Sequence, residues 1–275
     1  MKALIAQSRE GFINALRKRG IATTVLRDEL ITIPCPYDGT LWYGDRKINI
    51  SDYDFAIIVS LNKPAKHLYT VIHNHIPTFG DPYVRNLFDN KVTGQAIVSE
   101  HGIPVIPLLY NMTDPLVQME TLHDKVVVKM DNLANGINVK LFDLPLQYPQ
   151  EKRITQQYIE CGHTDQRWIV VGDRIVCAMQ RTASRDGEFR ANLGQGGTGA
   201  PIEITEDMQE LARRIVEPFP NFLYAGIDII TDPATNTRYF LEANLIPGSR
   251  IIEITHHNYY DDIVDYIINQ VNNKS

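Results

Sequence analysis

Two strand-like runs near the carboxyl end of the sequence carry polar side chains at spacings that suit a metal ion. Asp228 ends the first run, and the second, residues 239–241, leads directly into Glu242 and Asn244. Because successive side chains of a strand point to opposite faces, Glu242 and Asn244 share a face. If the two runs pair as a hairpin across the polar connection between them, the two carboxylates and the amide oxygen converge on one spot. Hard oxygen ligands of this kind suit Mg²⁺ that also holds phosphates.

Two stretches upstream of these runs also bring charged and amide side chains together. Asp165 and Arg167 are spaced to lie on one face of a strand, where an ion pair between them is the structural interpretation. Residues 187–192, Gly-Glu-Phe-Arg-Ala-Asn, put Arg190 two positions before Asn192, and a glycine-rich stretch follows. Such a stretch has the composition of any flexible linker, but the planar guanidinium of Arg190 offers a fork of donors for phosphoryl or oxyanion charge.

Two lysines precede these stretches in the chain. Lys129 lies near the end of an apolar strand-like run, residues 125–130, and its structural interpretation is an edge lysine on a plain hairpin with its stem over apolar surface. Lys91 follows Asn90 at the start of a predicted helix, where Asn90 has the side chain of an ordinary N-cap. Each lysine is therefore open to a structural and to a functional interpretation.

The elements that must position these residues follow from hydrophobic periodicity. Strands and helices alternate over roughly the first 90 residues, which indicates a small α/β domain with a parallel sheet. Gly172-Asp173 between two apolar runs predicts a hairpin, and the apolar stripe after Thr205 predicts an amphipathic helix. The predicted strands are residues 3–6, 23–26, 54–59, 125–130, 137–141, 154–159, 168–171 and 174–178, and the predicted helices include 10–19, 67–74, 89–100 and 258–270.

Composition excludes several classes of protein. Hydrophobic residues make up 44% and charged residues 22% of the 275 positions, as in a folded protein. A net charge of −6 and a sequence pI near 5.7 argue against nucleic acid as the main partner. No apolar run reaches the length of a membrane span, so no membrane association is expected. Cys35, Cys161 and Cys177 are widely spaced without a CxxC pattern, which predicts reduced, buried thiols in a cytoplasmic protein.

The order of the motifs resembles that of the ATP-grasp superfamily. Arg190-x-Asn192 precedes Asp228, which precedes Glu242-x-Asn244 and a Pro-Gly pair. Within the superfamily the sequence is most similar to RimK-type carboxylate–amine ligases, the alpha-L-glutamate ligases. The resemblance covers nearly the whole chain and is most specific over residues 158–248.

The resemblance implies an α/β (α+β) ATP-grasp fold in three parts. An N-terminal α/β domain with a parallel sheet would cover residues 1–90. A central lid domain would cover residues 91–160, and a C-terminal catalytic domain with a mixed sheet would cover residues 161–275.

It also implies a role for each motif. The lysines would meet ATP phosphates, the backbone at Gln157 and Tyr158 would contact adenine, and Asp165 would accept from the ribose hydroxyls. The residues assigned to the nucleotide are Lys91, Lys129, Gly136, Gln157, Tyr158, Asp165 and Arg190. Those assigned to catalysis are Arg190, Arg167 and Asn192, and those assigned to the metal are Asp228, Glu242 and Asn244.

The activity implied is ATP-dependent ligation of an amine to a carboxylate through an acyl phosphate, with release of ADP. The expected addition is of an amino acid, glutamate-like, to a peptide, a protein tail or a small carboxylate. Two alternatives remain open. One is an ATP-binding module without catalysis, which the bulky Leu133 and the non-glycine Asn138 in the expected phosphate loop favour. The other is a small-molecule synthetase of the dipeptide or glutathione type.

The cofactors and partners implied are those of such a ligase. ATP would bind with Mg²⁺, with a second ion and substitution by Mn²⁺ left open. The other partners would be an amino-acid amine donor and a carboxylate acceptor, and homo-oligomerisation is left open.

Overall fold

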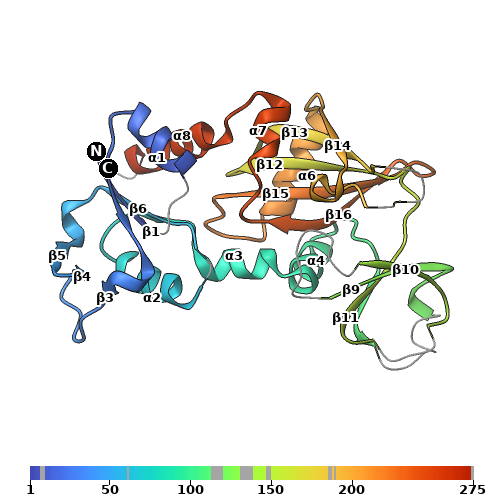
Figure 1. Cartoon of the computed structure of the whole chain (residues 1–275), viewed down its shortest axis with the longest axis horizontal. Coiled ribbons are helices and arrows are strands. Elements are labelled where there is room, and N and C mark those ends of the chain that lie inside the picture. Colours follow the sequence, from blue (N-terminus) through green and yellow to red (C-terminus); the bar gives the residue numbers. More distant parts are fainter. Residues whose placement is uncertain are drawn as a thin grey trace. The chain divides into compact units, whose positions relative to one another are not determined.

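The computed structural model (Figure 1) describes the chain except residues 7–9, 61, 113–119, 131–138, 147–149, 185–187, 189 and 274–275. Its contacts divide the chain into two units. The first unit comprises residues 1–87, 219–224 and 258–275, and the second comprises residues 88–218 and 225–257. The C-terminal helix therefore groups with the N-terminal residues, whereas the sequence-based division assigned it to a third domain. The three-domain division itself stays a prediction.

A parallel sheet forms the centre of the first unit, as the strand–helix alternation predicts. Every pairing in it is parallel, and its strand order is β2-β1-β6-β7. β6 is buried along its whole length, and so is β1 after its first residue, which explains their continuous apolar sequences. The strands are β1 (Lys2–Ala6), β2 (Ala22–Leu26), β6 (Phe55–Ile58) and β7 (Thr78–Phe79).

The helices of the first unit are close to their predicted positions, except the helix over Pro82–Asp89, which was not predicted. α2 begins earlier than residue 67 because Asn62 caps it, its Oδ1 accepting from the N–H of Ala65 at 2.9 Å, and Pro64 fits its first turn. The first unit ends within α3. The helices are α1 (Glu10–Lys18), α2 (Lys63–Ile72), α3 (Pro82–Asp89) and α8 (Tyr259–Asn272).

A small antiparallel sheet between β2 and β6 was not predicted. Its order is β3-β4-β5, and buried Leu41 and Ile48 join it to the core of the first unit. Its strands are only two to four residues long, so periodicity gives little signal for them. They are β3 (Ile31–Thr32), β4 (Thr40–Tyr43) and β5 (Arg46–Asn49), flanked by the 3₁₀ turns η1 (Asp28–Leu30) and η2 (Ile50–Asp52).

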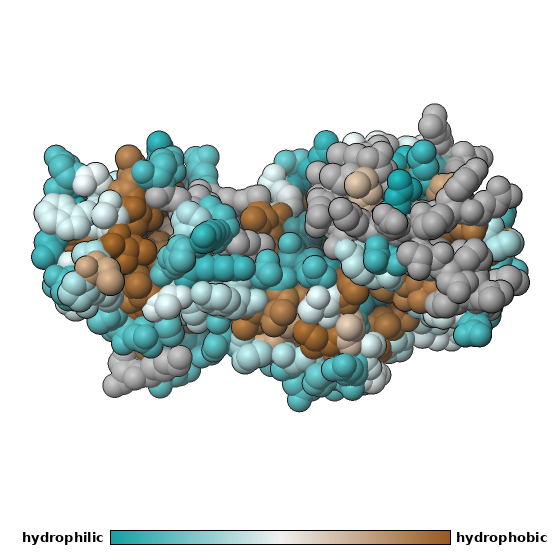
Figure 2. All heavy atoms as spheres, turned by 90° about the horizontal axis from the view of Figure 1, so that it is seen from below, coloured by the Kyte–Doolittle hydropathy of each residue, from teal (hydrophilic) through white to brown (hydrophobic). Residues whose placement is uncertain are grey.

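Apolar residues reach the surface of the first unit on the face drawn in Figure 2, where they appear as brown spheres at the left. Ile31, Ile33 and Val71 line a hollow between β3 and α2. The same side chains pack against the hydrophobic core of this unit, which includes Leu4 and Ile58. The core of the first unit thus extends to its surface at this hollow.

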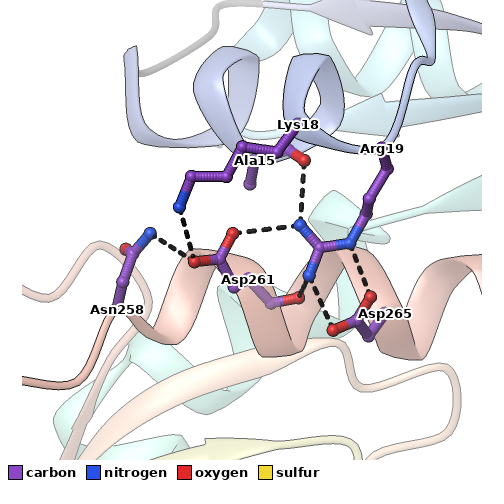
Figure 3. A network of polar contacts seen from close by, with 6 residues as sticks. All are labelled: Ala15, Lys18, Arg19, Asn258, Asp261 and Asp265. Atoms are coloured by element: carbon purple, nitrogen blue, oxygen red, sulfur yellow. Dashed lines mark hydrogen bonds and ion pairs between the residues drawn. The ribbon is translucent and has the colours of Figure 1, made fainter.

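A polar network fastens α8 to α1 (Figure 3). Arg19 donates to both carboxylate oxygens of Asp265, at 2.5 and 2.6 Å, and to the side chain and backbone oxygens of Asp261, at 3.0 and 2.9 Å. Lys18 donates to the other carboxylate oxygen of Asp261 at 3.0 Å. Phe12 of α1 packs edge-on against Tyr260 of α8, with ring centroids 5.0 Å apart. Because these contacts join residues about 240 positions apart, they tie the C-terminus into the N-terminal fold.

The second unit contains two sheets. The first has the order β10-β9-β11-β8 with antiparallel pairing throughout, and the second has the order β14-β13-β12-β15-β16. The strands of the first are β8 (Leu108–Met112), β9 (Lys125–Met130), β10 (Lys140–Asp143) and β11 (Gln150–Gln157). Those of the second are β12 (Thr164–Val171), β13 (Arg174–Thr182), β14 (Thr198–Pro201), β15 (Tyr224–Asp232) and β16 (Thr237–Asn244).

Helices pack on the five-stranded sheet of the second unit. α6 contacts β13, where Gln209 bonds both the N–H and the C=O of Ile175 at 2.9 Å, and α4 contacts β16. The stripe predicted after Thr205 is confirmed, since Met208, Ala212 and Ile215 are buried. The helices are α4 (Lys91–Glu100), α6 (Glu206–Val216) and α7 (Arg250–Thr255), with a 3₁₀ turn, η3 (Leu193–Gln195).

The structure also bears on the expected absence of membrane spans and on the expected burial of the cysteines. None of the helices in the described part of the chain combines the length and the apolar composition needed to cross a bilayer. The three cysteines are unpaired, with Cys177 buried and Cys161 half-buried. Cys35 is exposed, so the expectation that all three are buried is wrong for this residue.

Replacing Arg19 by Met keeps much of its stem but removes the guanidinium that joins α1 to α8. We expect the free energy of unfolding to fall by about 1–2 kcal/mol, because the lost hydrogen bonds are charge-assisted and only partly exposed. Arg17→Met is the matched control, since Arg17 bonds only locally, to Asn14 at 3.2 Å. Urea denaturation measures both variants, and equal losses would contradict the role given to Arg19.

The same contact should depend on pH. Burial by itself would raise the pKa of Asp261, but hydrogen bonds from Arg19 and Lys18 outweigh it and lower that pKa below 3.8. A carboxyl group whose pKa is lower in the folded state than in the unfolded state stabilises the fold fully above its unfolded-state pKa. This stabilisation is lost as the pH falls through the folded-state pKa. The difference between wild type and Arg19→Met should therefore be constant above pH 5 and shrink below about pH 3.8.

Candidate active site

One pocket of the second unit collects most of the residues predicted for the site. Residues of α4, β9, β11, β12, β13, β15 and β16 contribute to its wall. Of the predicted residues, those lining it are Lys91, Lys129, Gln157, Tyr158, Asp165, Arg190, Asn192, Asp228 and Glu242. Arg167 and Asn244 are not among the described residues that line it, and Gly136 lies outside the described residues, as do Leu133 and Asn138.

The predicted hairpin of β15 and β16 forms, and a bulge sets its register. Asp228 lies directly opposite Glu242, and Gly226 lies opposite Asn244. Next to the turn, however, Ile229 pairs with Phe240, so Leu241 is an extra residue without a cross-strand partner. Without this bulge Asp228 would face Leu241, and Glu242 would point to the other side of the sheet. The bulge thus brings the two carboxylates to one face.

Asn244 follows on the same face of β16. Its Oδ1 accepts a hydrogen bond from the backbone N–H of Ile246 at 3.0 Å, which holds the side chain at the end of the strand. Among the described residues, no three His, Cys, Asp or Glu side chains are grouped so that they could hold a metal ion. The predicted metal ligands, two carboxylates and an amide, thus lie on one hairpin, and their role as a metal site stays a prediction.

A second bulge, in the hairpin of β12 and β13, brings an arginine into the site that sequence reasoning missed. Ile169 pairs with Cys177 but Val170 pairs with Ile175, which leaves Val176 as the extra residue. As a result Asp165 lies opposite Arg181. Arg181 is 3% exposed and lines the pocket.

Two arginines and two aspartates form a largely buried charge cluster, and three of its members, Asp165, Arg181 and Asp228, line the pocket. Arg181 donates to both oxygens of Asp165, at 2.5 and 2.7 Å, and to Asp228 at 2.9 Å. Arg167 donates to both oxygens of Asp228, each at 2.6 Å. Asp165 therefore pairs with Arg181, and the ion pair of Asp165 with Arg167 that the sequence suggested is wrong. The cluster balances two positive against two negative charges.

The cluster sets the ionisation of its carboxyl groups in opposite directions. Asp228 is 1% exposed, and although burial alone would raise its pKa, attraction from Arg167 and Arg181 outweighs burial and lowers it. Burial raises the pKa of Asp165, because Arg181 only partly offsets it and Asp228 repels the second negative charge. Asp228 is thus held as a carboxylate although it is buried.

The two lysines approach the pocket from different elements. Lys91 is the first residue of α4, capped by Asn90, whose Oδ1 accepts from the N–H groups of Val92 and Thr93 at 3.1 and 2.9 Å. Its ammonium lies 3.8 Å from a carboxylate oxygen of Glu242. The helix-cap interpretation of this segment is therefore confirmed, and it leaves the lysine side chain at the pocket.

Lys129 is a buried lysine. It is 8% exposed, lies on β9 in the interior of its sheet, and donates to Oε1 of Gln156 at 2.9 Å. The interpretation as an edge lysine on a plain hairpin is wrong, because β10 and β11 cover both sides of β9. Gln156, which is 3% exposed, is a second site residue that sequence reasoning missed.

The remaining wall is apolar and includes the end of β11. The N–H of Tyr158 donates to the carbonyl of Lys125 at 3.0 Å, and the side chain of Gln157 bonds the backbone of His123 at 2.7 and 2.8 Å. Burial, with Glu160 adjacent, raises the pKa of Tyr158 to about 12, so its phenol stays protonated. The apolar side chains of this wall are Ile106, Val127, Val139, Ile159, Ile230 and Leu241.

Arg190 reaches the pocket from the segment that precedes η3. Glu188 accepts from its Nε and its terminal nitrogen, each at 2.8 Å, and from its backbone N–H at 3.0 Å. These bonds to Glu188 raise the pKa of the guanidinium. The neighbours Gly187 and Phe189 lie outside the described residues.

Comparisons with known proteins identify the family and the fold of the chain. Residues 89–267 match the model of the RimK-like ATP-grasp domain. A probable alpha-L-glutamate ligase of Xanthomonas euvesicatoria is 41% identical over 261 residues, covering 88% of this chain and 86% of that protein. The solved structure of the ATP-grasp ligase PsnB with its minimal precursor superposes with a TM-score of 0.76 at 15% identity, covering 98% of both chains, which shows the fold.

Several other relatives are longer than the region matched. Probable alpha-L-glutamate ligase 2 of Hahella chejuensis is 31% identical over 198 residues, 70% of this chain but 59% of that protein. A relative from Haemophilus influenzae is matched over half of its length. The family model nevertheless covers most of this chain and includes the whole pocket. The chain belongs to the RimK-like ATP-grasp family.

Proposed function

We propose that this chain is an ATP-dependent ligase that joins an amine to a carboxylate through an acyl phosphate and releases ADP. The observation that carries the proposal is the bulged hairpin, which sets Asp228 opposite Glu242 in a pocket that Lys91, Lys129 and Arg190 also line. Carboxylates that hold a metal and cations that meet phosphates are the two parts that phosphoryl transfer from ATP requires.

The nucleotide would lie along the pocket from its apolar to its charged part. The apolar wall, with the backbone at Gln157 and Tyr158, suits adenine. Asp165 would accept from the ribose hydroxyls, and Arg181, which binds both Asp165 and Asp228, fixes the spacing between the ribose and the metal ligand. Lys91 and Lys129, with Gly136, would neutralise the phosphates.

Asp228, Glu242 and Asn244 would hold Mg²⁺, and this set fits the ion because its donors are oxygens and Asp228 is held ionised. Bound there, Mg²⁺ would offset the negative charge that develops during phosphoryl transfer. Arg167 and Arg181 occupy lone pairs of Asp228, so they orient the carboxylate that the ion would share. A second ion, or Mn²⁺ in its place, belongs to the same proposal.

The reaction would proceed in two displacements. A carboxylate oxygen of the acceptor attacks the γ-phosphorus and ADP leaves, which gives an acyl phosphate. The amine then attacks the acyl carbon, phosphate leaves, and the amine loses a proton to give the amide. Arg190, assisted by Arg167 and Asn192, would stabilise the transferring phosphoryl group and the tetrahedral intermediate. Because Glu188 binds Arg190 bidentately, the guanidinium must share or exchange this partner to do so.

The substrates are inferred from the relatives. The matched proteins are named as probable alpha-L-glutamate ligases, which supports a glutamate-like amine donor. Neighbouring structures contain precursor peptides, in PsnB and in the macrocyclase MdnC, which supports a peptide or protein tail as the carboxylate acceptor. A D-cycloserine synthetase superposes with a TM-score of 0.64, and it supports the small-molecule alternative. A cytoplasmic location and a homo-oligomer belong to the same set of proposals.

Glu242→Gln tests the metal site without disturbing the charge cluster. It removes one negative charge at constant size, so turnover should fall on the order of 10²-fold or more while the unfolding temperature changes little. Asp228→Asn should lose turnover too, but it leaves two buried arginines undercompensated and should also cost roughly 3–5 kcal/mol of stability. Asp232→Asn, in the turn of the same hairpin, is the control.

The measurement for these variants is release of ADP as a function of Mg²⁺ concentration. Near-normal turnover of Glu242→Gln at ordinary Mg²⁺ would show that the metal assignment is wrong.

Arg190→Ala separates a ligase from an ATP-binding module. If Arg190 acts on the transition state, the variant should bind Mg-ATP within about threefold of wild type yet lose roughly 10³-fold in amide formation. Arg238→Ala, which removes a surface arginine from β16, is the control. Calorimetry gives ATP binding, and mass spectrometry of the products, with pooled amino acids and candidate carboxylates, gives amide formation.

The nucleotide product is a second test of the same proposal. Acyl-phosphate chemistry must release ADP, and release should be faster when the acceptor carboxylate is present. AMP as product, or tight ATP binding by wild type with no amide across a broad screen, would favour the alternatives.

A further inference from the structure

We propose that Gln95 and Gln156 form a one-way amide relay that positions the ammonium of Lys129 relative to the bulge of β16. The relay runs from the carbonyl of Leu241 through both glutamines to Lys129, all within the second unit. The inference rests on the proposed contact of Lys129 with ATP phosphates and adds two positioning residues to it.

The relay is a continuous chain of buried polar groups. Gln95 of α4 is 2% exposed and Gln156 of β11 is 3% exposed. Nε2 of Gln95 donates to the carbonyl oxygen of Leu241 at 2.6 Å, and Nε2 of Gln156 donates to Oε1 of Gln95 at 3.2 Å. Oε1 of Gln156 accepts from Nζ of Lys129 at 2.9 Å. Three consecutive hydrogen bonds thereby join four elements, β16, α4, β11 and β9.

The two ends of the relay fix the orientation of both amides. An ammonium only donates, so the oxygen of Gln156 must face Lys129. Its NH₂ group then faces two acceptors, Oε1 of Gln95 and the carbonyl of Ile106 at 3.4 Å. A backbone carbonyl only accepts, so the NH₂ group of Gln95 must face Leu241. Flipping either amide would place like groups against each other, so the chain has one stable direction.

The attachment point of the relay is the residue that the bulge leaves unpaired. Leu241 of β16 has no cross-strand partner in β15, and its neighbour in the chain is the carboxylate residue Glu242. Gln95 lies one helical turn after Lys91 in α4, so the same helix face binds the Leu241 carbonyl and brings Lys91 to Glu242. The relay therefore links the strand that carries a metal-ligand carboxylate to the lysine on the other sheet.

This linkage has a consequence for ATP binding. Lys129 should meet phosphate from a position set by β16, so that the distance between the ammonium and the metal carboxylates is fixed before ATP binds. Replacing Gln95 would keep the bond of Lys129 to Gln156 but would remove the constraint that β16 places on that pair through Leu241. The loss should therefore appear for ligands with phosphates and not for adenosine.

A double-mutant cycle between Gln95 and Lys129 tests the relay, because no hydrogen bond joins the two side chains directly. Gln95→Leu should weaken ATP binding roughly tenfold and leave adenosine binding unchanged. In a Lys129→Ala background the same change should weaken ATP less than about twofold, since no ammonium remains to be positioned. Calorimetry of the purified full chain with ATP and with adenosine measures all four corners of the cycle.

Two additional variants keep the result interpretable. Gln95→Glu keeps the size of the side chain but sets an acceptor against the Leu241 carbonyl, and it should reproduce the loss if Gln95→Leu does not fold. Gln209→Leu removes a half-buried glutamine that also makes two backbone bonds, but on α6, outside the pocket. It should lower the unfolding temperature comparably and leave ATP binding unchanged.

The outcomes separate the relay from the function on which it rests. If Gln95→Leu weakens ATP tenfold in both backgrounds, or weakens adenosine equally, the residue acts only on general structure and the relay is refuted. If Lys129→Ala itself leaves ATP affinity unchanged, the contact of Lys129 with phosphate fails, and the relay fails with it. The relay is supported if Gln95→Leu weakens ATP binding only when Lys129 is present, while Gln209→Leu does not change ATP binding.

Discussion

The site depends on one buried ionic interaction, the carboxylate of Asp228 held between the guanidinium groups of Arg167 and Arg181. A carboxylate with 1% exposure is stable as an ion only when opposite charges offset its lost hydration. The two arginines donate three hydrogen bonds to it. Two come from Nε and a terminal nitrogen of Arg167, and the third comes from Arg181. Because Arg181 also binds Asp165, the position of one aspartate constrains the other.

Two β-bulges give this cluster its partners. Each inserts one residue, Val176 in β13 and Leu241 in β16, and each shifts the register by one position on the side away from its turn. A shift of one position exchanges the faces of a strand, so the bulges decide that Arg181 and Glu242 point into the pocket. The bulge at Leu241 also presents a carbonyl to Gln95, which connects the hairpin to α4 and, through Gln156, to Lys129. The bulge at Leu241 is thus also the point at which the polar network of Gln95, Gln156 and Lys129 is attached to β16.

The first unit is stabilised mainly by apolar burial, together with ionic contacts between α1 and α8. In the first unit a doubly covered parallel sheet supplies apolar burial, while exposed and half-exposed charges on Lys18, Arg19 and Asp261 fasten the C-terminal helix to α1. Surface ion pairs contribute little singly, but Arg19 makes several bonds at once and is largely covered. This contact explains why residues 258–275 group with the N-terminal residues although the chain order placed them with the catalytic segment.

The sequence by itself determined the family, the order of the motifs and the long periodic elements, because these depend on residue type and local spacing. It selected Asp165, Arg190, Asp228 and Glu242, which the structure brings to one pocket, and it predicted both hairpins. It did not show that Arg181 and Gln156 line the same pocket, and the structural alternative that it offered for Asp165, an ion pair with Arg167, names the wrong arginine. Only the tertiary structure decided these points, because a bulge leaves no signal in residue spacing, and a one-residue change of register reverses which side chains meet.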